Sequence, residues 1–521
     1  MSLNICWKRA FPLIGISKWP SNGRASASPR KFSCFRPAGY FSTPLSFRCR
    51  SRICAAPTQP GEVGEGATDG RESQVKSTSW RWEESQDAGR AYAVWAAIVG
   101  AGAVPFISSH EGVDLFYFLS LAMVTIYIGS HRNMTARNRQ SITVKEGLLA
   151  PFLASAALFG GYLVLKFFPG LDVQSALNAY FGLVGTIAVA GNLQWPLRRW
   201  AGKGGLGAET LRLGVPDGWL IDEEGNALRE LRAAPTDAAA LALAVLVTYL
   251  DISNGHMLFP VNNAIATMIV ADLLGLLGIN SFRTAAVMLV GLLLYDVFWV
   301  FESPKVVGDN VMLAMATSSQ LNGPIKLLFP RTEAQIFSEG GSYPFELLGL
   351  GDVALPGLLA CLALRYDASR TIDIQGRAVA CAKALEDAMQ ELDPKATTSE
   401  IMNSAADAID TAYDEAFDDD ERRRESGVAV PEQVSQTVLG NRNFFFPVLG
   451  AYGLGLFIAF EANRITHLGQ PALLYLVPCT LGAIATTAFI RGESARLWSF
   501  TDRRAGPTLK ELWQKVDEKR T

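Results

Sequence analysis

Residues 284–301 read TAAVMLVGLLLYDVFWVF, and residues 345–364 read FELLGLGDVALPGLLACLAL. Both runs are apolar, yet the first carries Asp296 and the second carries Asp352. A carboxylate within the hydrocarbon of a bilayer costs at least about 2.5 kcal/mol on insertion scales, so such acids normally face a bundle interior or a water-filled cavity and mark function. If both runs are helices, a rise of ~1.5 Å per residue puts the two acids at nearly equal depths, about 7.5 and 10 Å from one face.

Apolar runs of this kind recur along the chain and determine its fold class. The chain has 521 residues, of which 49% are hydrophobic and 19% are charged, and its mean hydropathy is +0.17, as in many membrane proteins. We expect helices in ten runs: 91–109, 115–129, 147–165, 173–197, 238–250, 258–279, 284–301, 345–364, 444–460 and 472–490. The predicted fold is an all-α, polytopic membrane helix bundle of about nine transmembrane helices. The sequence leaves open whether 91–109 is an extra N-terminal span.

The N-terminal region has a composition unlike that of a folded domain. Residues 1–61 contain ten Lys or Arg, nine Ser and no Asp or Glu, which is typical of an organelle transit peptide. Residues 53–56, Ile-Cys-Ala-Ala, resemble a plastid-type cleavage site. A basic disordered tail that stays attached, or a mitochondrial presequence, would have a similar composition. A polar linker at 62–90 follows this leader.

Two polar inserts interrupt the predicted helices. The first, 201–236, reads as a flexible connector. The second, 366–442, reads as an acidic soluble loop, because 381–430 holds fourteen acids against five bases. Within it, apolar residues recur every four positions and predict an amphipathic helix at 399–418. The predicted organisation is transmembrane helices at 91–365, the acidic insert at 366–442, the last two transmembrane helices at 443–490 and a basic C-terminal tail at 491–521.

The basic residues indicate an orientation in the membrane. Arg and Lys follow the first, third, seventh and ninth helices of the nine-helix core, whereas the alternate connections 168–172 and 251–257 contain none. The positive-inside rule then puts the C-terminus and the acidic insert in the cytosol or an equivalent compartment such as the stroma.

The sequence contains no pattern for a metal or a cofactor. The seven cysteines and four histidines include no pair with zinc-ligand spacing. The glycine-rich stretch 202–207 lacks the strand context and the spacing of a phosphate-binding loop. We therefore expect no metal, no cofactor and no nucleic-acid partner.

Three motifs, in this order, resemble the signatures of the signal peptide peptidase family, which are intramembrane aspartic proteases related to presenilin. They are Tyr295-Asp296 within LLLYDVFWVF, Gly349-Leu350-Gly351-Asp352, and Pro471-Ala472-Leu473 at the start of the last predicted helix. The resemblance covers roughly residues 113–500 without the two inserts. It implies a presenilin-like bundle with Asp296 and Asp352 as catalytic residues.

The chemistry of two adjacent carboxyl groups agrees with that role. They cannot both ionise readily, so one keeps a proton near neutral pH and the other stays charged. In the mechanism that the resemblance implies, the charged carboxylate activates a water and the neutral carboxyl protonates the scissile carbonyl. The sequence does not assign the proton to Asp296 or to Asp352, because such groups titrate as a pair.

The residues around the acids have expected roles in shaping the site. Tyr295 is expected to form a hydrogen bond within it. Gly349 and Gly351 would allow close approach of a helix or of an unwound substrate, although ordinary small-residue packing explains them as well. By resemblance, Pro471, Ala472 and Leu473 shape the cavity, and proline suits the first turn of a helix.

Other features leave alternatives open. Asp272, within 258–279, could line the water cavity, contact a partner across the bundle or mark a misplaced helix, and we give it no catalytic role. Paired intramembrane acids also occur in proton-coupled transporters and channels. A family member without activity would be a scaffold.

The resemblance favours intramembrane cleavage, with transmembrane-helix substrates such as remnant signal peptides and type II membrane proteins. Besides these substrates, the expected partner is the lipid bilayer, and a homo-oligomer is left open. The expected location is the endoplasmic reticulum or another endomembrane, with a plastid membrane as the alternative.

Overall fold

The computed structural model describes most of the chain after residue 80. The described residues are 81–104, 112–135, 140–168, 172–202, 211–214, 230–308, 311–316, 322–331, 344–392, 396–425, 440–466 and 469–502. The predicted leader 1–61 and most of the linker and of the C-terminal tail lie outside them.

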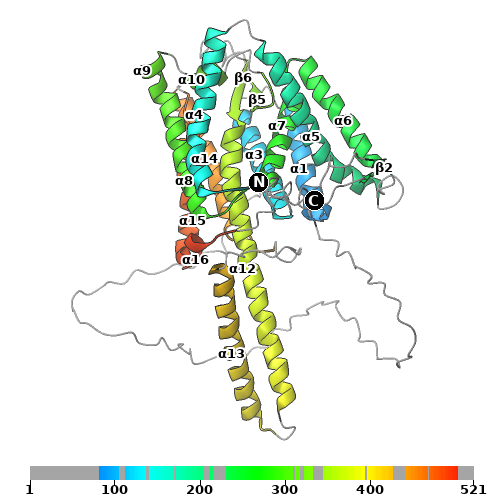
Figure 1. Ribbon diagram of the computed structural model, residues 1–521, viewed down its shortest axis with the longest axis vertical. Helices are drawn as coiled ribbons and strands as arrows, with labels where there is room; N and C mark the ends of the chain where they lie inside the picture. Colours follow the sequence, from blue (N-terminus) through cyan, green and yellow to red (C-terminus); the bar gives the residue numbers. More distant parts are fainter. Residues whose placement is uncertain are drawn as a thin grey trace, which may run out of the picture. The chain divides into compact units, whose positions relative to one another are not determined.

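The described part is a bundle of long helices (Figure 1). The helices are α1 Gln86–Gly102, α3 Val113–Thr135, α4 Val144–Phe167, α5 Val173–Ala201, α6 Pro235–Ser253, α7 Phe259–Leu276, α8 Phe282–Val297, α9 Ser303–Val307, α10 Val311–Ala316, α12 Leu350–Glu391, α13 Thr398–Glu425, α14 Phe445–Thr466, α15 Leu473–Ile490 and α16 Ser494–Ser499. The strands form three two-stranded pairs: β1 Gln140–Ile142 with β4 Leu277–Ile279, β2 Leu211–Gly214 with β3 Glu230–Ala233, and β5 Lys326–Pro330 with β6 Phe345–Gly349.

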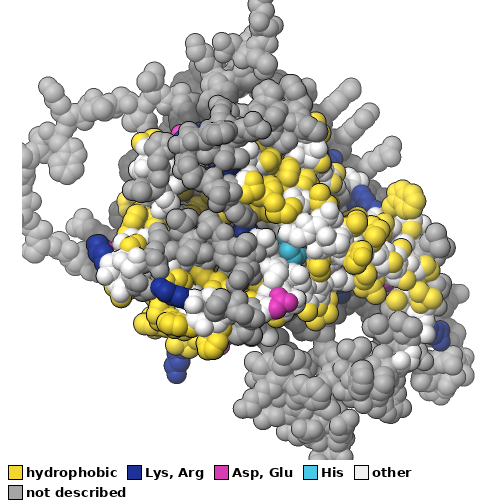
Figure 2. Space-filling model, turned by 90° about the horizontal axis from the view of Figure 1, so that it is seen from above, with side chains coloured by type: hydrophobic (Ala, Val, Ile, Leu, Met, Phe, Trp, Pro, Cys, Tyr) yellow, Lys and Arg dark blue, Asp and Glu magenta, His cyan; other side chains and the backbone are white. Residues whose placement is uncertain are grey.

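Eight described helices are long and apolar enough to cross a membrane. They are α3, α4, α5, α6, α7, the helix that begins with α8 and runs to Val306, α14 and α15. The outer surface agrees with this reading, because side chains such as Phe152, Ile187 and Leu246 are more than half exposed. Figure 2 shows hydrophobic side chains over much of the described surface at the end opposite the α12–α13 hairpin. The predicted polytopic helix bundle is confirmed.

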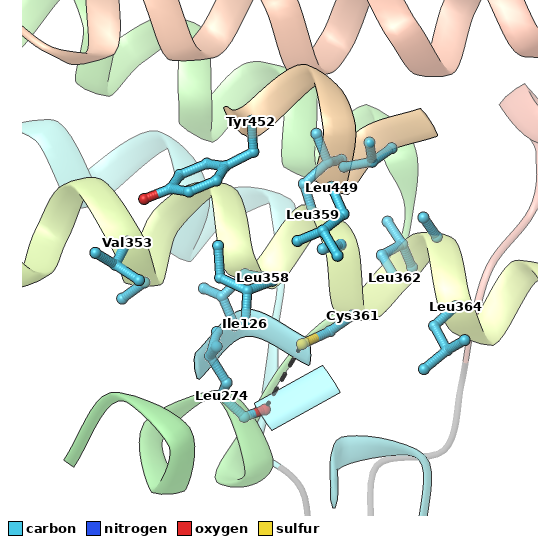
Figure 3. Close-up of a cluster of buried hydrophobic side chains, with 14 of the residues drawn as sticks. Ile126, Leu274, Val353, Leu358, Leu359, Cys361, Leu362, Leu364, Leu449 and Tyr452 are labelled. Carbon is cyan, nitrogen blue, oxygen red and sulfur yellow. Dashed lines mark hydrogen bonds between the residues drawn. The ribbon is translucent and has the colours of Figure 1, made fainter. Parts of the chain in front are cut away.

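The core lies where α3, α7 and α12 meet (Figure 3). Leu274 of α7 is fully buried between the other two helices. A Cβ atom on Gly129 of α3 would lie 2.7 Å from a side-chain atom of Leu274, and one on Gly357 of α12 would lie 3.0 Å from it. The two glycines therefore let three helices approach around one leucine, as small residues do in membrane bundles. This packing holds the first part of α12, and with it Asp352, at the centre of the bundle.

The helix predicted over 345–364 begins later than expected. Residues 345–349 form β6, which pairs antiparallel with β5, and α12 starts only at Leu350. The prediction of a helix from Phe345 is wrong because these residues pair with a strand from the preceding connection. Asp352 therefore lies in the first turn of α12, and the depth of about 10 Å counted along a helix from Phe345 does not apply.

The two inserts contain more regular structure than the sequence indicates. The expected connector 201–236 includes the hairpin of β2 and β3. The expected acidic loop 366–442 is largely a helical hairpin, since α12, which is 42 residues or about 63 Å long in all, continues to Glu391, and α13 returns along it (Figure 1). Arg377 of α12 contacts α13, because its guanidinium lies 3.4 Å from the Asp420 carboxylate and 5.5 Å from the ring centres of Tyr413 and Phe417.

We predict that Gly129→Val destabilises the bundle by about 2 kcal/mol, because the new side chain must push α3 away from Leu274. Thermal unfolding of the detergent-purified chain should shift down by several degrees. Gly482→Val in α15 is the matched control, since a Cβ there meets no atom within 4 Å. Equal shifts for the two variants would contradict the close packing of α3 on α7.

Candidate active site

Asp296 lies in the last turn of α8, where the regular helix ends. Residues 298–302 continue as a π-helical turn, a distortion that is frequent at functional sites. The Asp296 side chain is 2% exposed, and its Oδ2 accepts a hydrogen bond of 3.2 Å from the backbone N–H of Leu473. Leu473 is the first residue of α15, and Ala472 before it supplies no side-chain cap. Asp296 therefore occupies the place of a helix cap, because the first N–H groups of a helix have no partner within it.

Asp352 lies at the start of another helix. It is the third residue of α12, and Gly349 is the N-cap of that helix. A Cβ atom on Gly349 would lie 3.3 Å from Oδ2 of Asp352, so the carboxylate lies close over the junction between β6 and α12. The first turn of a helix favours a negative charge, because its N–H groups point toward it.

The two aspartates line one cavity of about 280 Å³. Gly349 and Ala472 contribute to its wall, so the three sequence motifs meet there. The remaining lining residues come from the π-helical turn, α10, β6, α14 and the segment before α15: Val300, Met312, Leu347, Leu348, Leu456, Ala459, Phe460, Asn463, Gly469 and Gln470. The wall is thus apolar apart from the two acids and two amide side chains. Such a cavity can hold water and a short piece of peptide beside both carboxyl groups.

The other predicted site residues lie next to this cavity rather than on its wall. Tyr295 is half-buried on α8, one residue before Asp296. Among the described residues, however, no hydrogen bond of its hydroxyl is present, in contrast to the prediction. Gly351 is exposed, and a Cβ atom added to it would meet no other atom within 4 Å. Leu473 acts through its N–H, and Pro471 precedes the N-cap of α15 instead of occupying its first turn.

Two asparagines that the sequence did not single out hold the strand pair beside the cavity. The side-chain amide of Asn263 donates to the Leu328 carbonyl at 2.7 Å and accepts from the Leu328 N–H at 2.8 Å. Asn262 donates to the Lys326 carbonyl at 3.0 Å. These α7 side chains form hydrogen bonds with the backbone at the outer edge of β5, as a third strand would. Two adjacent asparagines in an apolar run are the signal that could have indicated such a role.

Asp272 belongs to a different polar group. Its carboxylate lies 2.5 Å from the Arg132 guanidinium and accepts a hydrogen bond of 2.9 Å from Asn192. It therefore pairs across helices α3, α5 and α7, and it does not line the cavity of Asp296 and Asp352. Of the alternatives that the sequence left open, a partner across the bundle is the one observed.

The described residues include no group of three or more His, Cys, Asp or Glu side chains that could hold a metal ion. The two carboxyl groups are the chemically reactive side chains of the cavity lining. Paired carboxyls that share a proton provide an acid and a base together.

Comparison with known proteins agrees with the motifs. A family model described as signal peptide peptidase matches residues 134–504. Signal peptide peptidase of Mus musculus is 25% identical over 404 residues, which cover 76% of this chain and 85% of that protein. Signal peptide peptidase-like 1 of Arabidopsis thaliana is 27% identical over 293 residues, 51% of this chain and 60% of that protein.

Intramembrane protease 2 of Caenorhabditis elegans is 29% identical over 230 residues, 44% of this chain and 35% of that protein. No solved structure gives a significant match. Because the family model matches more than half of the chain, the chain belongs to the signal peptide peptidase family, a family of intramembrane proteases.

Proposed function

We propose that this protein hydrolyses peptide bonds within transmembrane segments and that Asp296 and Asp352 are its catalytic pair. One observation carries the assignment: two acids from different helices line a single cavity inside the bundle. The membership of the chain in a family of intramembrane proteases favours this activity over a proton-coupled transporter and over an inactive scaffold.

The proposed reaction uses the two carboxyl groups and one water. The charged carboxylate removes a proton from the water, whose oxygen attacks the scissile carbonyl carbon. The neutral carboxyl donates its proton to the carbonyl oxygen, which gives a gem-diol. The gem-diol then collapses: the carboxylate that is now charged takes a proton from one diol hydroxyl, the carboxyl that holds the proton of the water gives it to the amide nitrogen, and the C–N bond breaks. No covalent bond to the enzyme forms. The Leu473 N–H fixes the orientation of the Asp296 carboxylate for this exchange.

The strands beside the cavity support the expectation that a substrate helix unwinds locally. Leu347 and Leu348 of β6 line the cavity, and within the described residues β6 pairs only with β5. The outer edge of β5 is already occupied by the amide groups of Asn262 and Asn263. The second edge of β6 is therefore the one that can pair with an extended segment of substrate. Remnant signal peptides and type II membrane proteins are the proposed substrates.

We predict that Asp296→Ala and Asp352→Ala each reduce cleavage of a labelled transmembrane peptide by at least about 1,000-fold, because each removes one partner of the acid–base pair. The assay uses detergent-purified protein and detects products by mass spectrometry. Glu461→Gln, which removes an acid of α14 outside the cavity lining, is the matched control and should cleave normally. Cleavage that persists in both aspartate variants would refute the assignment, and proton flux without cleavage would favour a transporter.

We predict that Leu473→Pro reduces kcat by about 10- to 100-fold, because proline has no N–H to donate to Asp296. Proline is tolerated at the first position of a helix, so α15 should still form. Leu473→Met keeps both the N–H and the side-chain volume and should retain activity. Thermal unfolding of both variants checks that the fold is intact. A proline variant that folds and cleaves at the wild-type rate would show that this hydrogen bond does not position the acid.

The protein is a multi-pass membrane protein, and its compartment is a proposal. The family resemblance favours an endomembrane, whereas the composition of residues 1–61 favours a plastid. We propose an endomembrane location, with the C-terminus on the cytosolic side.

A fluorescent tag at the C-terminus, on the full chain and on residues 62–521, tests the location in plant cells. In an endomembrane location, both forms stay there. If the full chain enters plastids and the shortened chain does not, residues 1–61 are a transit peptide, the endomembrane proposal is wrong and the C-terminus is stromal.

A further inference from the structure

A second cavity, of about 890 Å³, lies between α1 and α5 and shares no lining residue with the catalytic cavity. Met268 of α7 also lines it, and both flanking helices pack on α7. The cavity extends along α5 from Arg199 to Asn192, which is about 10 Å at ~1.5 Å per residue. Its length and volume are large enough to receive part of a molecule.

The walls of this cavity are largely aromatic. Tyr92 and Trp95 of α1 and Trp195 of α5 line it. The Tyr92 hydroxyl donates to Asn192 at 3.1 Å, and the Trp95 indole N–H donates to Thr267 at 3.0 Å. Because the protein already satisfies these polar atoms, the rings present apolar surface to the cavity. Tryptophan and tyrosine in this arrangement are typical of the interface between bilayer and water.

The mouth of the cavity carries two arginines. Arg199 is held in place, because its Nη1 donates a hydrogen bond to the Ser85 carbonyl at 2.6 Å. Its guanidinium also packs on Gly89, since a Cβ atom added to Gly89 would lie 3.3 Å from Nη1. Arg90 is exposed on α1. Neither arginine forms an ion pair with any residue that the structure describes.

The one acid in the cavity lining points away from the arginines. Glu83 lies 3.6 Å from Arg132 of α3 and accepts a hydrogen bond from Thr135, so its charge is directed to that helix. A third cation, Arg81, lies 5.6 Å from the ring centre of Trp195 at the same end. The arginine side chains therefore give this end of the cavity a positive charge, next to an apolar interior.

The cavity therefore combines cationic side chains with apolar, aromatic walls. A ligand that fits this arrangement has an anionic head at the arginines and an apolar chain against the aromatic walls. A soluble anion would use the arginines and leave the aromatic walls bare, whereas a neutral lipid would leave the arginines without a counter-charge.

We propose that this cavity binds one anionic phospholipid, with its phosphate between Arg90 and Arg199 and the start of an acyl chain over Trp95, Trp195 and Met268. The lipid would join α1 to α5 and would take no part in catalysis by Asp296 and Asp352. Its binding does not depend on the proposed protease chemistry and is measured without it.

Native mass spectrometry of the detergent-purified full chain tests the proposal, with dioleoyl phosphatidylglycerol, dioleoyl phosphatidylcholine and inorganic phosphate as separate probes. We expect one phosphatidylglycerol to stay bound, with at least tenfold weaker retention of phosphatidylcholine and none of phosphate. The double variant Arg90→Gln/Arg199→Gln should weaken phosphatidylglycerol binding about tenfold or more, because basic residues at a membrane surface attract anionic lipids.

Two further variants make the result decisive. Arg283→Gln/Arg491→Gln removes the same charge from residues outside the cavity lining and should bind as the wild type does. Ala93→Trp keeps both arginines but fills the cavity, and it should lose the lipid. Equal retention of the two lipids, equal weakening by the two arginine pairs, undiminished binding by Ala93→Trp, or retention of phosphate alone would each overturn the proposal.

Discussion

The structure depends on the requirement that polar groups inside a membrane find their partners within the protein, because hydrocarbon supplies none. Three polar groups of the bundle illustrate this requirement. Asp272 is paired with Arg132, and the amides of Asn263 and Leu328 satisfy each other. Asp296 receives only one N–H, from Leu473, and otherwise faces a cavity. Asp296 is thus placed where a water and a substrate can approach.

The candidate active site is assembled from places where regular structure begins or ends. Asp296 precedes the π-helical turn after α8, Asp352 follows the change from β6 to α12, and Leu473 begins α15. Helix and strand ends have backbone groups that are not used within their own element, so they can orient side chains and bind peptide. Continuous helices would have saturated these groups and left no site for hydrolysis.

The sequence was sufficient to predict most of the long helices and to single out the two aspartates within them, because long apolar runs and charges inside such runs are local signals. It failed at 345–349, since FELLG is equally compatible with a helix and is made a strand by pairing with residues 326–330. The role of Asn263 depends on the same distant strand. The amphipathic helix predicted at 399–418 lies within α13, but the sequence does not predict that α12 continues past residue 366 and packs on α13, because the contacts of Arg377 with α13 join residues far apart in the chain.

The continuity of α12 has a consequence for the membrane around it. One unbroken helix joins Asp352 to the acidic hairpin outside the bundle. Arg365 within this helix lies 2.8 Å from the Asp502 carboxylate, with both side chains almost fully buried. The helix cannot slide along its axis without breaking that pair. In a thinner or thicker bilayer, the bundle must therefore tilt or the lipid must deform around it, while the distance between Asp352 and the hairpin stays constant.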